Sequence, residues 1–132
     1  MAINYTIEQG VSAAEVAAVF AASGIRRPVD DLERIARMIT NADIIACARD
    51  NGRLVGVARA LTDFSYCCYL SDLAVDRAYQ RQGIGRGLID LVAKTIGDES
   101  MLLLLSAPEA DEYYPHIGFG KADNAWIIAR KR

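Results

Sequence analysis

Glycine and arginine residues gather in one short stretch of this 132-residue chain, where their types and spacing could bind an anion. The stretch 73–87 starts as an apolar strand, passes through a polar turn and ends at a predicted helix. The first turn of a helix leaves backbone N–H groups unpaired and carries a positive partial charge, so it attracts phosphate. The glycines, which allow close approach to the backbone, are Gly83, Gly85 and Gly87, and the arginines are Arg77, Arg81 and Arg86. These features predict a phosphate-binding turn.

Two common phosphate-binding patterns do not fit this turn. The dinucleotide pattern needs a third glycine where Leu88 stands, and the P-loop pattern needs Gly-Lys followed by Ser or Thr at this position. The competing interpretation is a plain helix N-terminus with solvated arginines. We disfavour it because each glycine weakens a helix by about 0.5–1 kcal/mol relative to alanine.

Hydrophobic periodicity predicts the elements that precede the turn. Alternation over 3–7 indicates a strand, and capping patterns at Ser12–Glu15 and Asp30–Glu33 predict two helices, the first running to about Ser23. The runs 44–48, 54–61 and 66–75 predict a three-stranded antiparallel meander. Asn51-Gly52 is a strong hairpin signal between the first two of these strands.

The elements after the turn complete a mixed architecture. Helical spacing over 83–96 predicts a helix, and the fully apolar run 101–105 predicts a strand buried on both faces. A strand, a crossover helix and a second strand imply a right-handed parallel unit. We expect a short helix over 110–117 and two final short strands over 119–122 and 125–129.

Length and composition limit the function classes. The chain has room for a single domain, residues 1–132, and its formal net charge of -2 offers no general attraction to nucleic acid or an anionic membrane. We find no signal peptide and no apolar run long enough to span a bilayer. Three cysteines, an odd number in apolar surroundings, indicate a reducing compartment and no metal site. These observations predict a cytoplasmic protein.

Two motifs in order resemble one family. Gln80-Arg81-Gln82-Gly83-Ile84-Gly85, preceded by Leu73-Ala74-Val75, is similar to the cofactor segment of the GCN5-related N-acetyltransferases (GNAT), and Tyr113-Tyr114-Pro115-His116-Ile117-Gly118-Phe119 resembles a second segment of that family. The resemblance implies an α/β (α+β) fold with a mixed, mostly antiparallel central sheet, splayed at a bulge and flanked by about four helices. It also implies acetyl-CoA as cofactor.

The resemblance assigns cofactor contacts residue by residue. Pantetheine would pair with the backbone beside Leu73, Ala74 and Val75, in the manner of an added strand. The pyrophosphate would be bound by the turn, namely Gln80, Arg81, Gln82, Gly83, Ile84, Gly85 and Arg86. Ser106 stands where many members carry an asparagine, so it would supply a weaker hydrogen bond to the cofactor.

Acetyl transfer to an amine by direct attack, through a tetrahedral intermediate, needs a proton for the leaving thiolate. A tyrosine is protonated at neutral pH, and Tyr114 holds the position of the family's general acid, although it could also be an ordinary core tyrosine. Asp72 is the candidate general base; its alternative role is to stabilise the bulge where the sheet splays. His116, the only histidine, is interpreted as a surface residue.

The acceptor is not specified by any motif. Candidate pocket residues are Arg26, Arg27, Asp63, Phe64 and Trp126, and the resemblance extends to members that acetylate arylalkylamines and polyamines. We expect a small-molecule amine, or a protein or peptide amine, as acceptor, and a homodimer is compatible with the sequence. A non-catalytic acyl-CoA sensor, which would have no use for Tyr114, and a nucleotide-binding regulatory domain are the alternatives.

Overall fold

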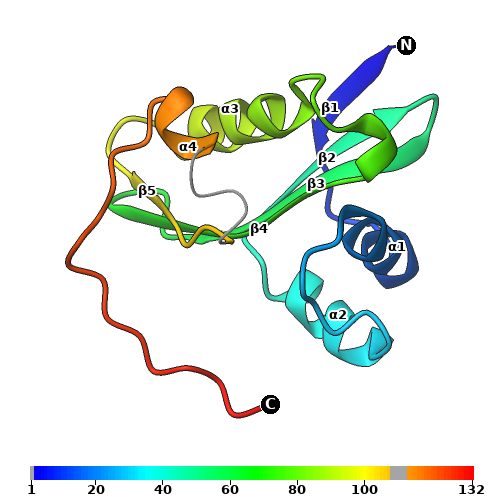
Figure 1. Cartoon of the computed structure of the whole chain (residues 1–132), viewed down its shortest axis with the longest axis horizontal. Helices are drawn as coiled ribbons and strands as arrows, with labels where there is room; N and C mark the ends of the chain where they lie inside the picture. The colour runs from blue at the N-terminus through cyan, green and yellow to red at the C-terminus, as the bar shows by residue number, and fades with distance from the viewer. Residues whose placement is uncertain (1, 108–112) are drawn as a thin grey trace.

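The computed structural model describes residues 2–107 and 113–132 and shows one five-stranded sheet with helices on both faces (Figure 1). The strand order is β1-β2-β3-β4-β5, in which the first four strands are antiparallel neighbours and β5 is parallel to β4. The strands are β1 (Ile3–Ile7), β2 (Ile44–Asp50), β3 (Arg53–Thr62), β4 (Cys67–Val75) and β5 (Met101–Leu104). The mixed, mostly antiparallel sheet confirms the predicted fold class.

Within the described residues, four α-helices form the outer layers. Helices α3 (Ile84–Ile96) and α4 (Tyr113–His116) lie on one side of the sheet, and α1 (Ala13–Ser23) and α2 (Leu32–Thr40) lie on the other (Figure 1). A short 3-10 helix, η1 (Arg77–Tyr79), follows β4. Because successive side chains of a strand point to opposite faces, each strand contributes to the hydrophobic core on both sides of the sheet. In β2, Ile44 packs with the buried residues of α3, and Ile45 packs with those of α1 and α2.

Local sequence signals set the ends of these elements. The Ser12 side chain accepts a hydrogen bond from the Glu15 backbone N–H at 3.1 Å and starts α1. Asp31 caps α2 by accepting from the Arg34 N–H at 3.0 Å, one residue later than the capping pattern from Asp30 predicts. The hairpin turn uses Asn51 and Gly52, both with positive φ, as their sequence predicts.

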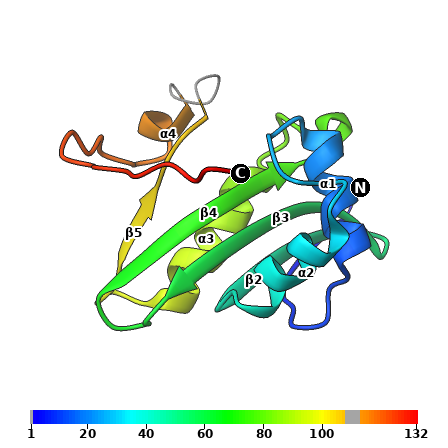
Figure 2. The ribbon, with the colours of Figure 1, turned by 90° about the horizontal axis from the view of Figure 1, so that it is seen from below.

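The sheet splays beside a bulge in β4. Arg59 pairs with Asp72 and the next residue, Ala60, pairs with Leu70, so Ser71 is an extra residue on the bulged strand. The parallel pairing of β4 with β5 covers only Cys67–Leu70, and beyond that point the two strands diverge (Figure 2). The remaining part of β4, from Ser71 to Val75, therefore has an edge that no described strand covers.

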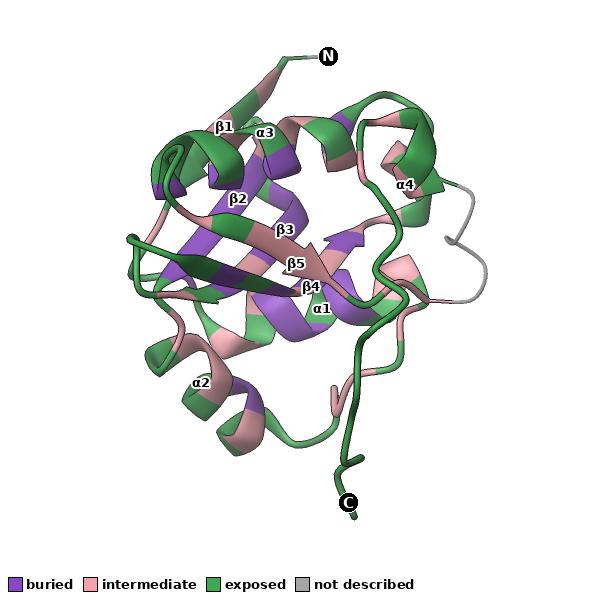
Figure 3. Cartoon of the chain, turned by 90° about the vertical axis from the view of Figure 1, so that its left-hand side faces the viewer, coloured by how far each residue is buried: buried purple, intermediate pink, exposed green. Residues whose placement is uncertain are grey.

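Two expectations for the C-terminal third are wrong. The strand over 101–105 is not buried on both faces: it is the last strand of the described sheet, and Met101 and Leu105 are 56% and 52% exposed. The segments 119–122 and 125–129 form no strand, and the chain from Gly120 onwards is exposed (Figure 3). Their apolar residues find no neighbouring strand within residues 2–107 and 113–132, and strand propensity alone does not order a segment. Of the predicted helix 110–117, α4 covers Tyr113–His116, and residues 110–112 lie outside the described ranges.

Candidate active site

The predicted phosphate turn forms the N-terminus of α3. Gly83 is the N-cap residue, with φ of 83°, and no side chain caps the helix. The Gly87 N–H donates to the Gly83 carbonyl at 3.0 Å as the first bond of the helix, which leaves the earlier N–H groups at an open helix end. Arg81 also has positive φ, at 65°, and Arg81 and Arg86 are both exposed. The turn therefore presents backbone donors and two guanidinium groups to an anion.

Glycine is favoured at the three positions of the turn for different structural reasons. A Cβ at Gly83 would enter open space, so the positive φ rather than crowding favours glycine there. A Cβ at Gly85 would lie 3.4 Å from the Tyr113 hydroxyl, whereas one at Gly87 would lie 2.6 Å from the Tyr5 ring. Gly87 therefore serves packing of β1 on α3, and only Gly83 and Gly85 belong to the anion site.

Side chains around the turn hold it against the sheet. The Gln80 Nε2 donates to the Val75 carbonyl at 2.9 Å, and the Tyr79 hydroxyl donates to Asp50 at 2.7 Å. Arg77 points away from the turn, because its guanidinium lies against Gly24 at the end of α1. Gln80 is thus an anchor of the turn, and Arg81 and Arg86 are the exposed arginines in the sequence beside the open helix end.

A cleft opens where β4 and β5 diverge. Its larger cavity, about 630 Å³, lies between the α1–α2 loop, the bulge of β4, the end of β5 and Tyr114. A second cavity of about 510 Å³ lies between β5 and the chain that follows α4, and it shares Leu104, Leu105, Ser106 and Tyr114 with the first. The first cavity is lined by Gly24, Ile25, Arg26, Arg27, Leu70, Ser71, Leu73, Leu104, Leu105, Ser106, Ala107 and Tyr114. The structure therefore brings Leu73, Ser106 and Tyr114 together.

Tyr114 lies between the two cavities with its ring held by aromatic contacts. The Tyr114 ring centroid is 5.3 Å from that of Tyr113 and 5.5 Å from that of Phe119, both in edge-to-face arrangements. Burial, and secondarily the charge that Tyr113 would carry, raises the pKa of the Tyr114 hydroxyl above its ordinary 10. The hydroxyl is therefore protonated at neutral pH, as a proton donor must be.

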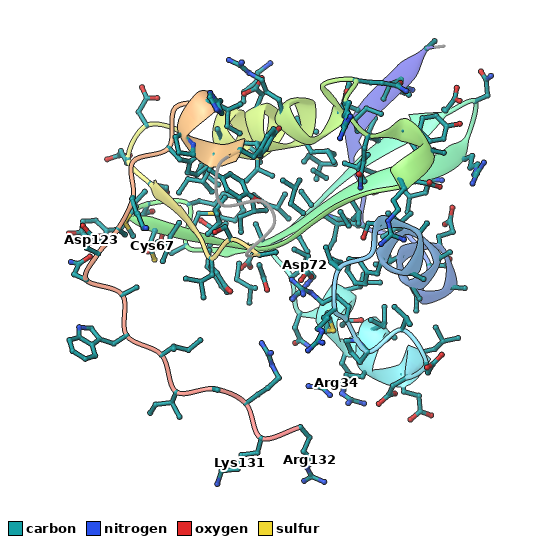
Figure 4. The ribbon with its side chains drawn as sticks, viewed as in Figure 1. Arg34, Cys67, Asp72, Asp123, Lys131 and Arg132 are labelled. Carbon is teal, nitrogen blue, oxygen red and sulfur yellow. The ribbon has the colours of Figure 1, made fainter. Side chains whose placement is uncertain are left out.

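Asp72, which is labelled in Figure 4, is fully buried and bound by two arginines at the bulge, Arg27 and Arg59. The Arg27 Nε donates to its Oδ1 at 2.5 Å, and the Arg59 Nε donates to its Oδ2. The same guanidinium groups bind the bulged Ser71: Arg27 donates to its carbonyl at 2.9 Å and Arg59 to its hydroxyl at 3.0 Å. A carboxylate held in this way is poorly placed to accept a proton from an amine, so the geometry favours the bulge-stabilising alternative.

Arg59 is the site residue that sequence reasoning missed. It lies in the run 54–61, in which every other residue is apolar or glycine. The Arg59 side chain is only 12% exposed, and a buried arginine needs an anionic partner. A single arginine inside an apolar strand was therefore the sequence signal that could have identified it. The partner itself, thirteen residues away across the bulge, could not be identified from spacing.

The other acceptor candidates separate into two groups. Arg26 and Arg27 line the larger cavity. Asp63 instead organises the β3–β4 turn, because its Oδ1 accepts from three backbone N–H groups, which lowers its pKa to about 2. Phe64 and Trp126 line neither cavity, and Trp126 is 96% exposed.

Comparison with known proteins gives one family. A family model described as "Acetyltransferase (GNAT) domain" matches residues 12–127. The Glycine max protein named Histone acetyltransferase TAP1 is 30% identical over an alignment of 107 positions, which covers 71% of this chain and 45% of that protein. The chain therefore spans about half the length of this relative.

Solved structures share the fold. One is a Staphylococcus aureus protein of unknown function, described as a probable acetyltransferase, with a TM-score of 0.85 and 21% sequence identity. The match covers 99% of this chain and 100% of the Staphylococcus aureus chain. The aminoglycoside N-acetyltransferase AAC(6')-Iy in complex with CoA has a TM-score of 0.73 at 16% identity, covering 99% and 96%.

Proposed function

Because the chain belongs to the GNAT family of acetyltransferases, we propose that it transfers the acetyl group of acetyl-CoA to a primary amine of a small molecule, or of a protein or peptide. The observation that carries the proposal is the proximity of three features: the open N-terminus of α3, the uncovered edge of β4 and the Tyr114 hydroxyl. A Cβ at Gly85 of α3 would lie within 4.0 Å of Val75 and Leu73 in β4, and Leu73 lines the larger cavity together with Tyr114. Because the soybean relative is named a histone acetyltransferase, we keep a protein amine among the proposed acceptors.

The residues present fit the cofactor that the family uses. Backbone N–H groups at Gly83–Arg86, with Arg81 and Arg86, would hold a pyrophosphate. The β4 backbone from Leu73 to Val75 would pair with pantetheine, because β5 leaves that edge uncovered. Ile84 would contribute only its backbone, since its side chain is buried in the core. Bound acetyl-CoA would supply an activated acyl carbon and a thiolate leaving group.

We assign Tyr114 as the general acid. Its hydroxyl, which burial keeps protonated, would donate its proton from Oη to the leaving thiolate, and aromatic contacts hold the ring in place for this. Asp72 stays a predicted general base, but its two arginine partners favour a positioning role at the bulge. Ser106 lines both cavities beside Tyr114 and stays a predicted cofactor contact.

We place the reaction in a reducing, cytoplasmic compartment. Cys47, Cys67 and Cys68 are all free thiols. Cys47 is buried, and burial raises its pKa to about 12, so it is inert at neutral pH. Within residues 2–107 and 113–132, every helix falls short of the length and apolar character that crossing a bilayer requires.

The proposal is tested by following thiol release from acetyl-CoA in the presence of a panel of amines, with CoA binding measured in parallel. Thiol release that depends on an amine, with the acetylated amine detected by mass spectrometry, is the expected result. Tight CoA binding without acetyl transfer to any amine would identify the chain as an acyl-CoA sensor instead. Absence of CoA binding would remove both functions.

A further inference from the structure

Among the described residues that line it, the larger cavity carries an excess of positive charge. Arg26 and Arg27 line it, and the other ten residues that line it include no acidic side chain. Behind its wall, Asp72 is shared between Arg27 and Arg59, so one carboxylate faces two guanidinium groups. Arg77 adds a further guanidinium against Gly24, which also lines the cavity. Glu109, Asp111 and Glu112 lie outside the described ranges.

The guanidinium group of Arg27 is preorganised to bind an anion. Its guanidinium donates to Asp72, to the Ser71 carbonyl and, at 2.6 Å, to the Arg26 carbonyl. These bonds fix the plane of the guanidinium, while two of its five N–H donors have no part in them. A fixed donor loses little conformational entropy when it binds an anion. Arg26, which is exposed and also lines the cavity, adds a second cation.

We infer that the acceptor carries a carboxylate beside its amine: an amino acid or a molecule of similar charge pattern. This inference rests on the proposed acetyltransferase function. The carboxylate would bind Arg26 and Arg27 while the amine lies toward Tyr114, across the same cavity. A polyamine or another polycationic acceptor would bring its second charge against these arginines and be disfavoured.

The test compares acceptors that differ only in the charge of the group at the end opposite the reacting amine. We would measure kcat/KM for 6-aminohexanoate, 6-aminohexanamide and 1,6-diaminohexane, and for an α-amino acid against its amide, at saturating acetyl-CoA. Loss of one charge-assisted bond costs about 1.5–3 kcal/mol, or about 10–100-fold in kcat/KM. We expect the carboxylates to exceed their amides by about that factor, with the diamine lowest. Equal rates for carboxylate and amide, or a preference for the diamine or a basic peptide, would overturn the inference.

A variant pair locates the effect. Arg26→Ala should lower kcat/KM for the carboxylate acceptor about tenfold or more, with little change for the amide and an unchanged KM for acetyl-CoA. Arg37→Ala, an exposed arginine of α2 that lines neither cavity, is the matched control and should behave like wild type. If every acceptor fails, the proposed function fails and the inference falls with it. If only the charge preference fails, the proposed function stands.

Discussion

Replacing Gly83 with aspartate tests the phosphate turn with little disturbance of the fold. Gly83 has φ of 83°, so any side chain there costs about 1–2 kcal/mol of backbone strain, and a Cβ would meet no other atom. Gly83→Asn carries the same strain and nearly the same shape without the charge, so it is the matched control. The difference between the two variants isolates the electrostatic effect on the cofactor.

The expected magnitude follows from the contacts at the helix end. An aspartate at the N-cap would occupy the open N–H groups itself and repel a pyrophosphate, so about two charge-assisted bonds would be lost. At about 1.5–3 kcal/mol each, CoA binding should weaken by about 3–6 kcal/mol relative to wild type. The asparagine variant competes for the same donors without repulsion, so it should lose less.

Isothermal titration with CoA, alongside thermal denaturation of both variants, measures this effect. We expect both variants to fold, with similar melting temperatures, and the aspartate variant to bind CoA at least tenfold more weakly than the asparagine variant. If folded Gly83→Asp and Gly83→Asn bind CoA equally, the negative charge does not meet a phosphate, and the assignment of this turn is wrong.

Two further predictions concern the buried ion pairs and pH. Asp72→Asn leaves the guanidinium groups of Arg27 and Arg59 without their anion, so the free energy of unfolding, measured in urea, should fall by about 3–5 kcal/mol; an unchanged value would refute the structural role. Hydrogen bonds from Arg49 lower the pKa of Glu8 below its ordinary 4.5, so its contribution to stability is complete above pH 4.5 and is lost as pH falls through the lower folded value. Glu8→Gln should flatten the stability profile in that acidic window, as followed by denaturation at several pH values.

Much of the fold follows from local sequence signals. The hairpin at Asn51-Gly52, the Ser12 cap and the helix that starts after Gly83 each depend on residues adjacent in the chain, so their patterns predict them correctly. The turn and Tyr114 were found because their motifs lie within short segments. That Tyr114 and Leu73 line one cavity depends on the splayed sheet, which the family resemblance implied.

The remaining features depend on distant contacts. Arg59 and Asp72 meet because a bulge shifts the register of β3 against β4, and the residue spacing does not encode that shift. The burial of β5 was overestimated because an apolar run gives no information about whether another strand covers it. The segment 125–129 has strand propensity but no partner strand in the part of the chain that the structure describes, and propensity does not identify a partner.

The turnover of Tyr114→Phe tests the central claim most directly, because the change removes one hydroxyl and keeps the aromatic contacts with Tyr113 and Phe119. With the amine acceptor that gives the fastest thiol release, we predict a loss in kcat of about 10²–10⁴, with the KM for acetyl-CoA nearly unchanged. Since the pKa of Tyr114 is raised above 10, wild-type kcat should fall only at strongly alkaline pH, and that limb should be absent in the variant. A folded Tyr114→Phe enzyme with wild-type kcat would contradict the assignment of this hydroxyl as the proton donor in acetyl transfer.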